Sequence, residues 1–561
     1  MKNIKGSIAL SLLTVAAGAL SSCGGGGEKV VQFWSSFGNT YQAALQSVVA
    51  HVSEKTGIEI QHESQGSYPG IYKNMNAMIG PQAYPDIAMG YPDHFAHYIG
   101  SEILVPMEDR LTKELEEDFY PEYMEENWFV DSNGNKHLYG IPFNKSTEVL
   151  GYNGTFVEYC AQWCKENGHE GDPAWNLGQI PQTWQDWDAR GDNYMTVYKT
   201  IVGNVLYGKR DNTGAAIQGQ FKVYSKADAP VNSAGDLVND ADGREYLIDM
   251  REIKDSDIRL MSWDSTDNAF ITLVRQWGAK YTELPEDQYE YEMDEREGNV
   301  LFASAAEKEK VIDCLSFFKK LQKRQIFNTP KAGSFSSDAF ATGSVMFMVC
   351  SSGGLSYNTK TPSYRFKIAP IPYYADGTNT RKLVISQGAN ICMTDAHSKR
   401  YDSNWEVIKY LTTGQYQTEW CLKTGYYPCS KSAAESEEYK SFLNEAKPEE
   451  IQKYADAHGM TYADREKEVY ATQARVAYRE GSQVNSEVYM DKSTGWTKFV
   501  DDAFIGSAEI REVVKNALMY TFNSDAIEAN PDDRDAYYTD VIKKLVEDNS
   551  IKFSKNINVV K

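Results

Sequence analysis

The segment that begins at Lys29 carries a β-α-β pattern, and this pattern constrains the fold more than any other feature of the sequence. Residues 29–34 form an apolar run that predicts a buried strand. The next stretch has an apolar stripe at helical spacing and ends at Gly57, after which Ile58 to Ile60 alternates like a strand. A helix between two strands is the usual crossover of a parallel pair, so we expect an α/β fold.

The pattern continues beyond this first unit. A second helix is predicted at about residues 68–79, and Pro85 to Met89 reads as another short buried strand. In parallel sheets ligands bind beyond the carboxyl ends of the strands. The loops after Trp34, Gln61 and Met89 are therefore the first places to look for a site. A new alternating run at residues 148–152 starts a second α/β region.

Length and charge restrict the possibilities further. A chain of 561 residues is longer than one hydrophobic core usually covers, so two lobes are expected. The formal net charge of -22 repels the phosphate backbone of nucleic acids, so a DNA or RNA partner is excluded. After about residue 430 the chain becomes strongly charged and reads as helical.

The N-terminus reads as an export signal. Lys2 and Lys5 precede a mostly apolar stretch at residues 7–20, which is too short to span a bilayer. Leu20-Ser21-Ser22-Cys23 then resembles the bacterial lipobox, in which the cysteine is lipidated. We therefore predict a lipoprotein signal peptide at residues 1–22, lipidation of Cys23 and a Gly-rich tether at residues 23–28. The protein is expected outside the cytoplasm, anchored to a bacterial membrane. An ordinary signal peptide with a chance cysteine is the alternative.

The remaining cysteines indicate neither a disulfide framework nor a metal site. They are an odd number spread over a large chain. Cys160 and Cys164 share one face of a predicted helix, but a zinc site would need two further ligands close to this pair. We expect these side chains to pack in the core, and we expect no metal and no cofactor.

Several short blocks, taken in order, resemble one family. They are residues 32–35, 66–68, 85–87, 141–147, 181–186, 340–347, 350–353, 386–389 and 420–428. Each block is weak alone, but their shared order behind a lipobox is specific. On these motifs the chain resembles the extracellular solute-binding lipoproteins of ABC importers, in the large bilobal class that binds sugars and glycerol-3-phosphate.

The resemblance implies a two-lobed periplasmic-binding-protein-like fold in which the lobes close over a solute. Hinge crossings are expected near residues 142–147, 340–350 and 384–388. Lobe 1 is then expected at residues 29–142 and 343–384. Lobe 2 is expected at residues 143–342 and 385–430, with an insertion at about 192–257. Residues 431–561 are expected to form a helical region that packs on the lobes.

The resemblance also implies ligand contacts, carried over one residue at a time. They are Tyr68, Asp93, Ser146, Trp263, Ser351, Gly388 and Tyr426. Asp93 is only a near match to the acidic residue of the family, and a cleft tryptophan of the family falls on Trp263. Aromatic platforms beside hydroxyl and carboxylate groups suit a sugar, which has apolar ring faces and hydroxyl rims.

One contact of the family does not transfer. The arginine that holds the phosphate of glycerol-3-phosphate finds no counterpart around residues 498–503. A buried phosphate needs compensating positive charge, so a neutral carbohydrate is favoured over glycerol-3-phosphate or a glycerophosphodiester. The implied partners are this solute and the transmembrane subunits of an ABC permease, and the protein is expected to be a monomer.

Two readings from other classes stay open. A secreted glycosidase would use paired carboxylates, such as Asp264 with Asp267 or Glu63 with Asp93. In a chain with 79 acidic residues such pairs arise by chance, so we do not expect an enzyme. A surface lipoprotein that captures glycans without a permease is the other reading.

Overall fold

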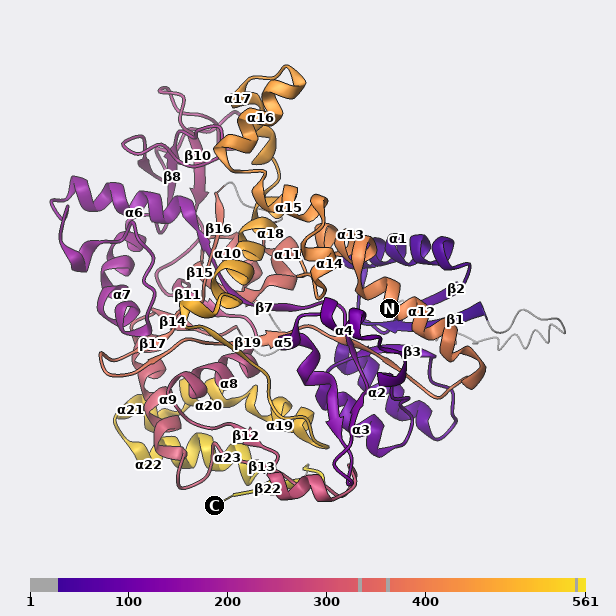
Figure 1. Cartoon of the computed structure of the whole chain (residues 1–561). Helices are drawn as coiled ribbons and strands as arrows, with labels where there is room; N and C mark the ends of the chain where they lie inside the picture. Colours follow the sequence, from indigo (N-terminus) through magenta and orange to yellow (C-terminus); the bar gives the residue numbers. More distant parts are fainter. Residues whose placement is uncertain (1–28, 331–334, 360–363, 550–552, 561) are drawn as a thin grey trace, which may run out of the picture.

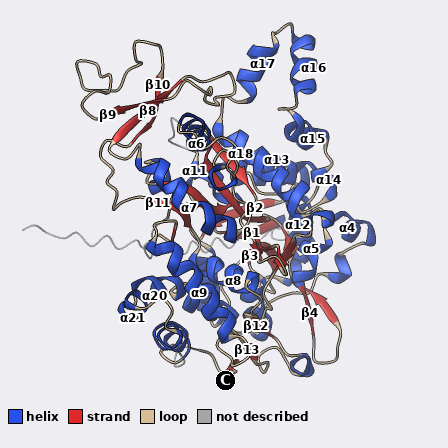
Figure 2. Ribbon diagram, turned by 90° about the vertical axis from the view of Figure 1, so that its left-hand side faces the viewer, coloured by secondary structure: helices blue, strands red, loops and turns tan. Residues whose placement is uncertain are grey.

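A computed structural model of the chain describes residues 29–330, 335–359, 364–549 and 553–560. The predicted signal peptide, the tether and the lipidation site Cys23 lie outside these residues. The described chain folds into two α/β lobes, each built on its own sheet, with helices around the strands (Figures 1 and 2).

The first lobe contains the predicted β-α-β units. Its sheet has the strand order β2-β1-β3-β20-β6, in which β1 pairs in parallel with β2 and β3. The strands are β1 (Val30–Ser35), β2 (Glu59–Ser64), β3 (Ile87–Gly90), β6 (Ile141–Pro142) and β20 (Asn390–Met393). The helices around them are α1 (Asn39–Thr56), α2 (Tyr68–Ile79), α3 (Pro92–Gly100), α12 (Tyr401–Thr412) and α13 (Gly414–Thr424).

Local sequence signals explain the ends of the first two helices. Gly57 ends α1 in the left-handed conformation, with φ of 66°, and its amide donates to the carbonyl of Ser53. The side chain of Ser67 accepts from the amide of Gly70 and so caps the start of α2. This cap places Tyr68 at the first position of the helix, at the carboxyl edge of the sheet.

The second lobe is built on a larger mixed sheet. Its order is β14-β11-β15-β7-β19-β21, and β16 also pairs with β7. The strands are β7 (Ser146–Asn153), β11 (Arg259–Trp263), β14 (Phe327–Asn328), β15 (Val345–Ser351), β16 (Phe366–Ala369), β19 (Leu383–Gln387) and β21 (Thr497–Phe499). The helices that pack around them are α6 (Gly154–Glu166), α7 (Trp184–Lys199), α8 (Thr266–Gln276) and α9 (Lys308–Lys323).

Two of the expected crossings are in place and lie side by side. The chain passes from β6 to β7 through residues 143–145 and returns from β19 to β20 through Gly388 and Ala389. Lys145 Nζ donates to the carbonyl of Gly388 at 2.9 Å. Gly388 has φ of 97°, and a Cβ atom there would lie 1.9 Å from the carbonyl oxygen of Asn144. Only glycine fits between the two crossings.

The strand pairing corrects the expected division of the lobes. Residues 345–351 form β15, an interior strand of the second sheet between β11 and β7, so no crossing occurs at 340–350 and this segment is not part of lobe 1. Residues 390–393 form β20 of the first sheet, so the segment after Gly388 belongs to lobe 1 rather than lobe 2. A run of buried residues predicts a strand but does not say which sheet it joins.

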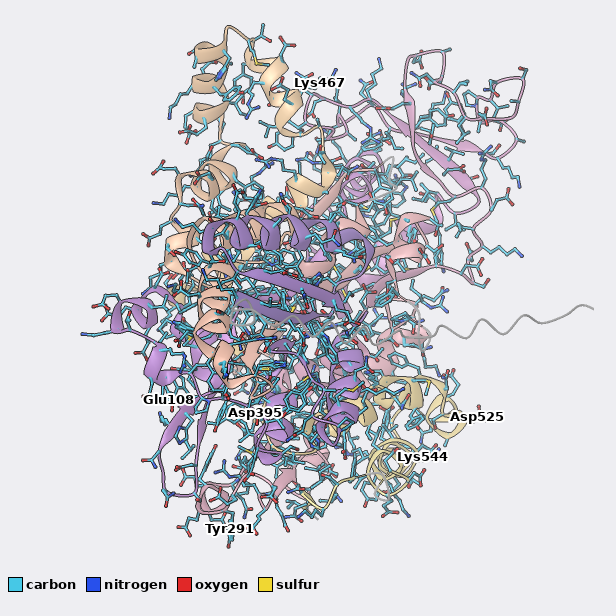
Figure 3. The ribbon with its side chains drawn as sticks, turned by 90° about the vertical axis from the view of Figure 1, so that its right-hand side faces the viewer. Glu108, Tyr291, Asp395, Lys467, Asp525 and Lys544 are labelled. Carbon is cyan, nitrogen blue, oxygen red and sulfur yellow. The ribbon has the colours of Figure 1, made fainter. Side chains whose placement is uncertain are left out.

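Two segments project from the lobes (Figure 1). Within the expected insertion, β8 (Asn204–Gly208), β9 (Lys222–Ser225) and β10 (Glu245–Asp249) form a separate sheet. In the C-terminal region α16 (Pro448–His458) and α17 (Tyr462–Val469) form the second projection. Lys467 of α17 and Tyr291 mark opposite ends of the molecule (Figure 3).

The rest of the C-terminal region is mostly helical and packs on both lobes. It contains α14 (Lys431–Ala434), α15 (Glu437–Asn444), α18 (Gln473–Gln483), α19 (Ser507–Val514), α20 (Ala517–Asn523), α21 (Asp525–Ala529), α22 (Arg534–Tyr537) and α23 (Lys544–Val546). Helix α18 packs on β16, α20 packs on α8 and α9, and α19 touches both α8 and α3. Strand β21 pairs with β19, so this region makes a further passage to the second sheet.

The described residues contain no disulfide, no cluster of metal ligands and no membrane-spanning helix. The seven cysteines from Cys160 to Cys429 are buried, and none is in a disulfide within this part of the chain. No group of three or more possible metal ligands occurs among the described residues. None of the helices in this described part of the chain is long and apolar enough to cross a membrane.

Candidate ligand-binding cleft

A large cavity lies between the two lobes and has a volume of about 1220 Å³. The first lobe contributes Tyr68 and Asp93, the second lobe contributes Asp264 and Ser351, and α19 contributes Arg511. The crossing strands pass along it, since Ser146, Gln387 and Gly388 also line it. A pocket of this size between two lobes is the ordinary setting for a bound small molecule.

Six of the seven predicted contact residues line this cavity. They are Tyr68, Asp93, Ser146, Ser351, Gly388 and Tyr426. They come from both lobes and from the crossings, so residues far apart in the sequence meet at one place. Their individual roles in binding stay predictions.

Trp263 is the exception, and the structure corrects its placement. It ends β11 and is fully buried, with no exposed surface. Its indole Nε1 donates to Glu148 Oε1 at 2.8 Å, and its ring stacks on Trp184 at 6.2 Å. Trp263 therefore belongs to the core of the second lobe and does not line the cavity. An alternating strand presents side chains to two faces, and the sequence did not show which face carries Trp263.

One end of the cavity is aromatic. The ring of Tyr426 stacks on Trp420 at 5.7 Å, and Phe37 lies 5.8 Å from Tyr426. Tyr41 donates through Oη to the carbonyl of Gly353 at 2.5 Å. Tyr426 is thus an aromatic ring that lines the cavity and is supported from behind by Trp420.

The N-terminal wall, which we define as Tyr68, Tyr72, Tyr91, Asp93 and His94, comes from α2 and the start of α3. The rings of Tyr68 and Tyr91 meet edge to face at 4.8 Å, and Tyr72 stacks on His94 at 4.7 Å. Asn144 Nδ2 donates to Tyr68 Oη at 2.7 Å, which ties this wall to the first crossing. Burial raises the pKa of each of the three tyrosines, so their hydroxyls stay protonated.

The C-terminal wall, defined as Asp501, Asp502, Glu509 and Arg511, was missed by the sequence analysis. Arg511 Nη2 donates to Asp267 Oδ2 at 3.0 Å, and Nη1 donates to Asp501 Oδ2 at 3.1 Å. The cleft thus contains an arginine after all, eight residues beyond the segment 498–503 where the family pattern placed it. The pattern of acidic residues ahead of the apolar stripe of α19 was the signal that could have pointed to it.

Charged side chains of the second lobe near this wall act on one another. Although burial opposes it, the Arg511 guanidinium lowers the pKa of the Asp267 carboxyl. Burial raises the pKa of Glu148 to about 8, so this carboxyl behind the cavity is mostly protonated at neutral pH. Burial also raises the pKa of Asp264, which accepts from the amide of Ser336 at 2.7 Å.

Comparison with known proteins identifies the family. Residues 47–449, more than half of the chain, match the model of the bacterial extracellular solute-binding proteins. The chain belongs to this family. The resemblance expected from the short motifs is therefore confirmed.

Among curated relatives, this solute-binding protein is similar to the sn-glycerol-3-phosphate-binding periplasmic protein UgpB. The match to the Yersinia pestis protein is 29% identical over 143 residues, 23% of this chain and 33% of that protein. The match to the Escherichia coli K12 protein is 23% identical over 120 residues, 21% of this chain and 27% of that protein. The chain spans about a third of the length of the curated relatives it matches.

Solved structures confirm the two-lobed fold. The GacH receptor of Streptomyces glaucescens, solved unliganded and with acarbose, has a TM-score of 0.56 at 12% identity, over 92% of this chain and 98% of that chain. UgpB from Mycobacterium tuberculosis in complex with glycerophosphocholine also has a TM-score of 0.56, at 16% identity, over 94% and 100%. The maltotriose binding protein of Thermus thermophilus has a TM-score of 0.53 at 13% identity, over 92% and 97%.

Proposed function

We propose that this protein captures a carbohydrate in the interlobe cleft and delivers it to an ABC permease, without acting as an enzyme. The family, the cavity between the lobes and the carbohydrate complexes of similarly folded proteins support this proposal. The observation that carries it is the lining of the cavity, in which supported tyrosine rings lie beside polar groups.

Several of these polar groups lack a partner within the protein. The buried atoms Tyr281 Oη, Thr282 Oγ1, Ser386 Oγ and Gln387 Oε1 belong to residues that line the cavity, and none has a hydrogen-bond partner among the described residues. A buried polar group without a partner costs about 1–3 kcal/mol. A polyhydroxylated ligand that reached these atoms would remove that cost.

The cleft carboxylates argue for binding rather than hydrolysis. A glycosidase needs one carboxylate free to act as nucleophile or base and a second to act as acid. Asp267 is instead paired with Arg511, and Asp264 accepts from the backbone of Ser336. The sequence offered two candidate pairs of catalytic carboxylates. In one of them, Asp264 with Asp267, both carboxylates therefore make structural contacts within the protein.

Arg511 favours a second candidate ligand, glycerol-3-phosphate or a glycerophosphodiester. A guanidinium in a cleft is a natural partner for a phosphate oxygen. Two carboxylates already bind Arg511, however, so a phosphate would compete with Asp267 and Asp501 for its donors. A neutral carbohydrate can bind without displacing Asp267 or Asp501 from Arg511.

A thermal-shift screen against sugars, polyols and glycerophosphodiesters, followed by calorimetry, tests the proposal. We expect a sugar or oligosaccharide to raise the Tm, and we expect Tyr426→Leu and Ser351→Ala to weaken its binding. Trp263→Phe is the matched control, because it changes an aromatic side chain outside the cavity. Micromolar binding of glycerol-3-phosphate with no response to any sugar would replace the first candidate by the second.

We also propose that the protein is lipid-anchored through Cys23 on the outer side of a bacterial membrane. The lipobox sequence and the extracellular family support this. Cys23→Ser should abolish labelling with radioactive palmitate and block cleavage by the lipoprotein signal peptidase. Acylation that persists in this variant would show that Cys23 is not the anchor.

A further inference from the structure

The two lobes also meet at a second place, apart from the crossings. Helices α3 and α19 touch at the edge of the cavity, to which they contribute Asp93 and Arg511. At the end of α3, a Cβ atom on Gly100 would lie 2.8 Å from Ile505 Cδ1 and 3.3 Å from Asp294 Cβ. The contact between the lobes therefore continues past the cavity, along α3 toward the segment around residue 294.

Two segments meet beyond this contact, one from each lobe. In the first lobe, β4 (Trp128–Val130) and β5 (Lys136–Leu138) form an antiparallel hairpin. Opposite the hairpin lies the loop of residues 286–297, which leads into β13 (Gly298–Val300). Tyr291 of this loop is labelled at the lower edge of the molecule in Figure 3.

The loop is attached to the second lobe. Directly after β13, the amide of Leu301 donates to the carbonyl of Tyr281 at 3.0 Å. The ring of Tyr281 meets Phe270 of α8 edge to face at 6.4 Å. Movements of the second lobe should therefore carry this loop with them.

A buried asparagine fixes the shape of the loop. Asn556 is 4% exposed, and its Nδ2 donates to the carbonyls of Asp294 at 2.9 Å and Arg296 at 2.8 Å. Strand β13 pairs with β22 (Ile557–Val559), which follows Asn556 directly. The loop is thus shaped by contacts on its own side of the cleft, and it presents Arg296 in a fixed position.

Two hydrogen bonds join the loop to the hairpin. Arg296 Nη2 donates to the carbonyl of Val130 at 2.5 Å, and Ser132 Oγ donates to Glu292 Oε1 at 2.5 Å. Each bond has one partner from each lobe. We call Val130, Ser132, Glu292 and Arg296 the clasp. Among the described residues that line the cavity, none belongs to the clasp.

Arg296 is a buried cation, with only 1% of its surface exposed. A buried charge needs hydrogen-bond partners to offset the loss of water. Arg296 Nε donates to the carbonyl of Tyr291 at 3.0 Å, and the guanidinium carbon lies 5.3 Å from the ring of Tyr289. Both tyrosines belong to its own loop, so the bond to Val130 is what couples Arg296 to the first lobe. A hydrogen bond from a charged donor is stronger than one between neutral groups.

We infer that Arg296 is a positioning residue for solute binding: the clasp holds the two lobes together beyond the edge of the cavity and opens whenever the cleft opens to admit or release a solute. Arg296 acts through the carbonyl of Val130 and makes no contact with the solute itself. A contact that exists only when the lobes are together shifts the population toward that arrangement. The inference goes beyond the proposed function and does not depend on which solute the cleft takes.

The distance across the clasp tests the inference in the ligand-free protein. Positions 136 and 295 are exposed and lie on opposite sides of the clasp. Spin labels attached to p-acetylphenylalanine at both positions report this distance by pulsed electron paramagnetic resonance and leave every cysteine unmodified. We expect two distance populations, a short one for the clasped arrangement and a longer one for the open arrangement.

Variants on both sides of the clasp change the ratio of these populations. Arg296→Met removes the guanidinium and should lower the ratio of clasped to open protein about tenfold. Arg296→Lys keeps a cationic donor, so the ratio should fall less. Ser132→Ala leaves the loop of Arg296 untouched and should lower the ratio about threefold. Ser225→Ala is the matched control, because it removes a hydroxyl bond to a carboxylate, that of Asp228, within the insertion and should leave the ratio unchanged.

A lower ratio in both Arg296→Met and Ser132→Ala, with an intermediate ratio in Arg296→Lys, supports the clasp. Equal ratios in the original protein and in these variants overturn the inference, and so does an original protein that shows the long distance alone. If Arg296→Met lowers the Tm and broadens both distances while Ser132→Ala changes nothing, Arg296 serves only the fold of its own loop and the inference fails. Because no ligand is used, failure of the carbohydrate proposal would leave this result standing.

Discussion

The two walls of the cleft differ in how they are built. The N-terminal wall follows directly from the first β-α-β units, because Tyr68 starts α2 and Asp93 lies in the first turn of α3. The C-terminal wall arrives more than 400 residues later in the sequence, on α19, and ion pairs of Arg511 hold it in place. The N-terminal wall is thus formed by local chain geometry, whereas the C-terminal wall depends on ion pairs between distant segments.

The first prediction separates both walls from the core behind them. Trp263→Ala should destabilise the protein by about 3–5 kcal/mol, because it removes a fully buried indole and leaves Glu148 without its donor. Urea unfolding measures the loss. Ligand affinity measured well below the unfolding transition should stay within about twofold of the original, since Trp263 touches neither wall. A specific loss of affinity in Trp263→Phe, a variant that keeps most of the packing, would put this residue back into the site.

The second prediction breaks the C-terminal wall. Arg511→Gln leaves the carboxylate of Asp267 without its cationic partner, whereas Asp501 keeps its ion pair with Arg275, and the change should cost about 3 kcal/mol in unfolding free energy. The double variant with Asp267→Asn removes the unpaired charge and should recover part of the loss. A destabilisation below about 0.5 kcal/mol would mean that ion pairs do not hold this wall.

The third prediction concerns the strand that leads into the C-terminal wall. Lys498 on β21 donates to Tyr123 Oη at 3.0 Å, and burial together with the charge of Lys145 lowers its pKa to about 7. The unfolded chain keeps the ordinary lysine pKa of about 10.4, so it binds more protons than the folded protein between these two values. The stability should therefore rise as the pH rises through this window.

Lys498→Met is the comparison for this pH dependence. Relative to the variant, the original protein should gain on the order of 1–2 kcal/mol between about pH 7 and pH 9. Urea unfolding at several pH values measures the difference. Parallel pH profiles in the two proteins would show that Lys498 does not titrate in this range.

The fourth prediction tests the N-terminal wall. Tyr68→Phe removes the oxygen that accepts from Asn144 Nδ2 and should cost about 1 kcal/mol, less than the loss of Arg511. Thermal unfolding measures the change. Tyr72→Phe is the matched control, because it also removes a tyrosine hydroxyl from this wall but one that makes no hydrogen bond to Asn144. A loss as large as that of Arg511→Gln would contradict the contrast between a locally built wall and one held by charge.

The same contrast explains what the sequence could predict. The β-α-β units and the end of α1 at Gly57 depend on short-range patterns, which periodicity reveals. The six cavity residues lie far apart in the sequence, and they were predicted from the resemblance to a known family. The sheet that β15 joins, the face of β11 that carries Trp263 and the position of Arg511 depend on contacts between segments hundreds of residues apart. No local pattern contains those contacts, so the lobe boundaries and the C-terminal wall required the structure.

The central claim is that a solute binds between the two lobes. A ligand that contacts both walls stabilises the closed arrangement through the contacts it gains there. Small-angle X-ray scattering with and without a saturating ligand from the calorimetric screen tests this most directly. We predict a smaller radius of gyration and a higher Tm when the ligand is bound. A ligand that binds tightly while the radius of gyration stays unchanged would contradict closure of the lobes over the cleft.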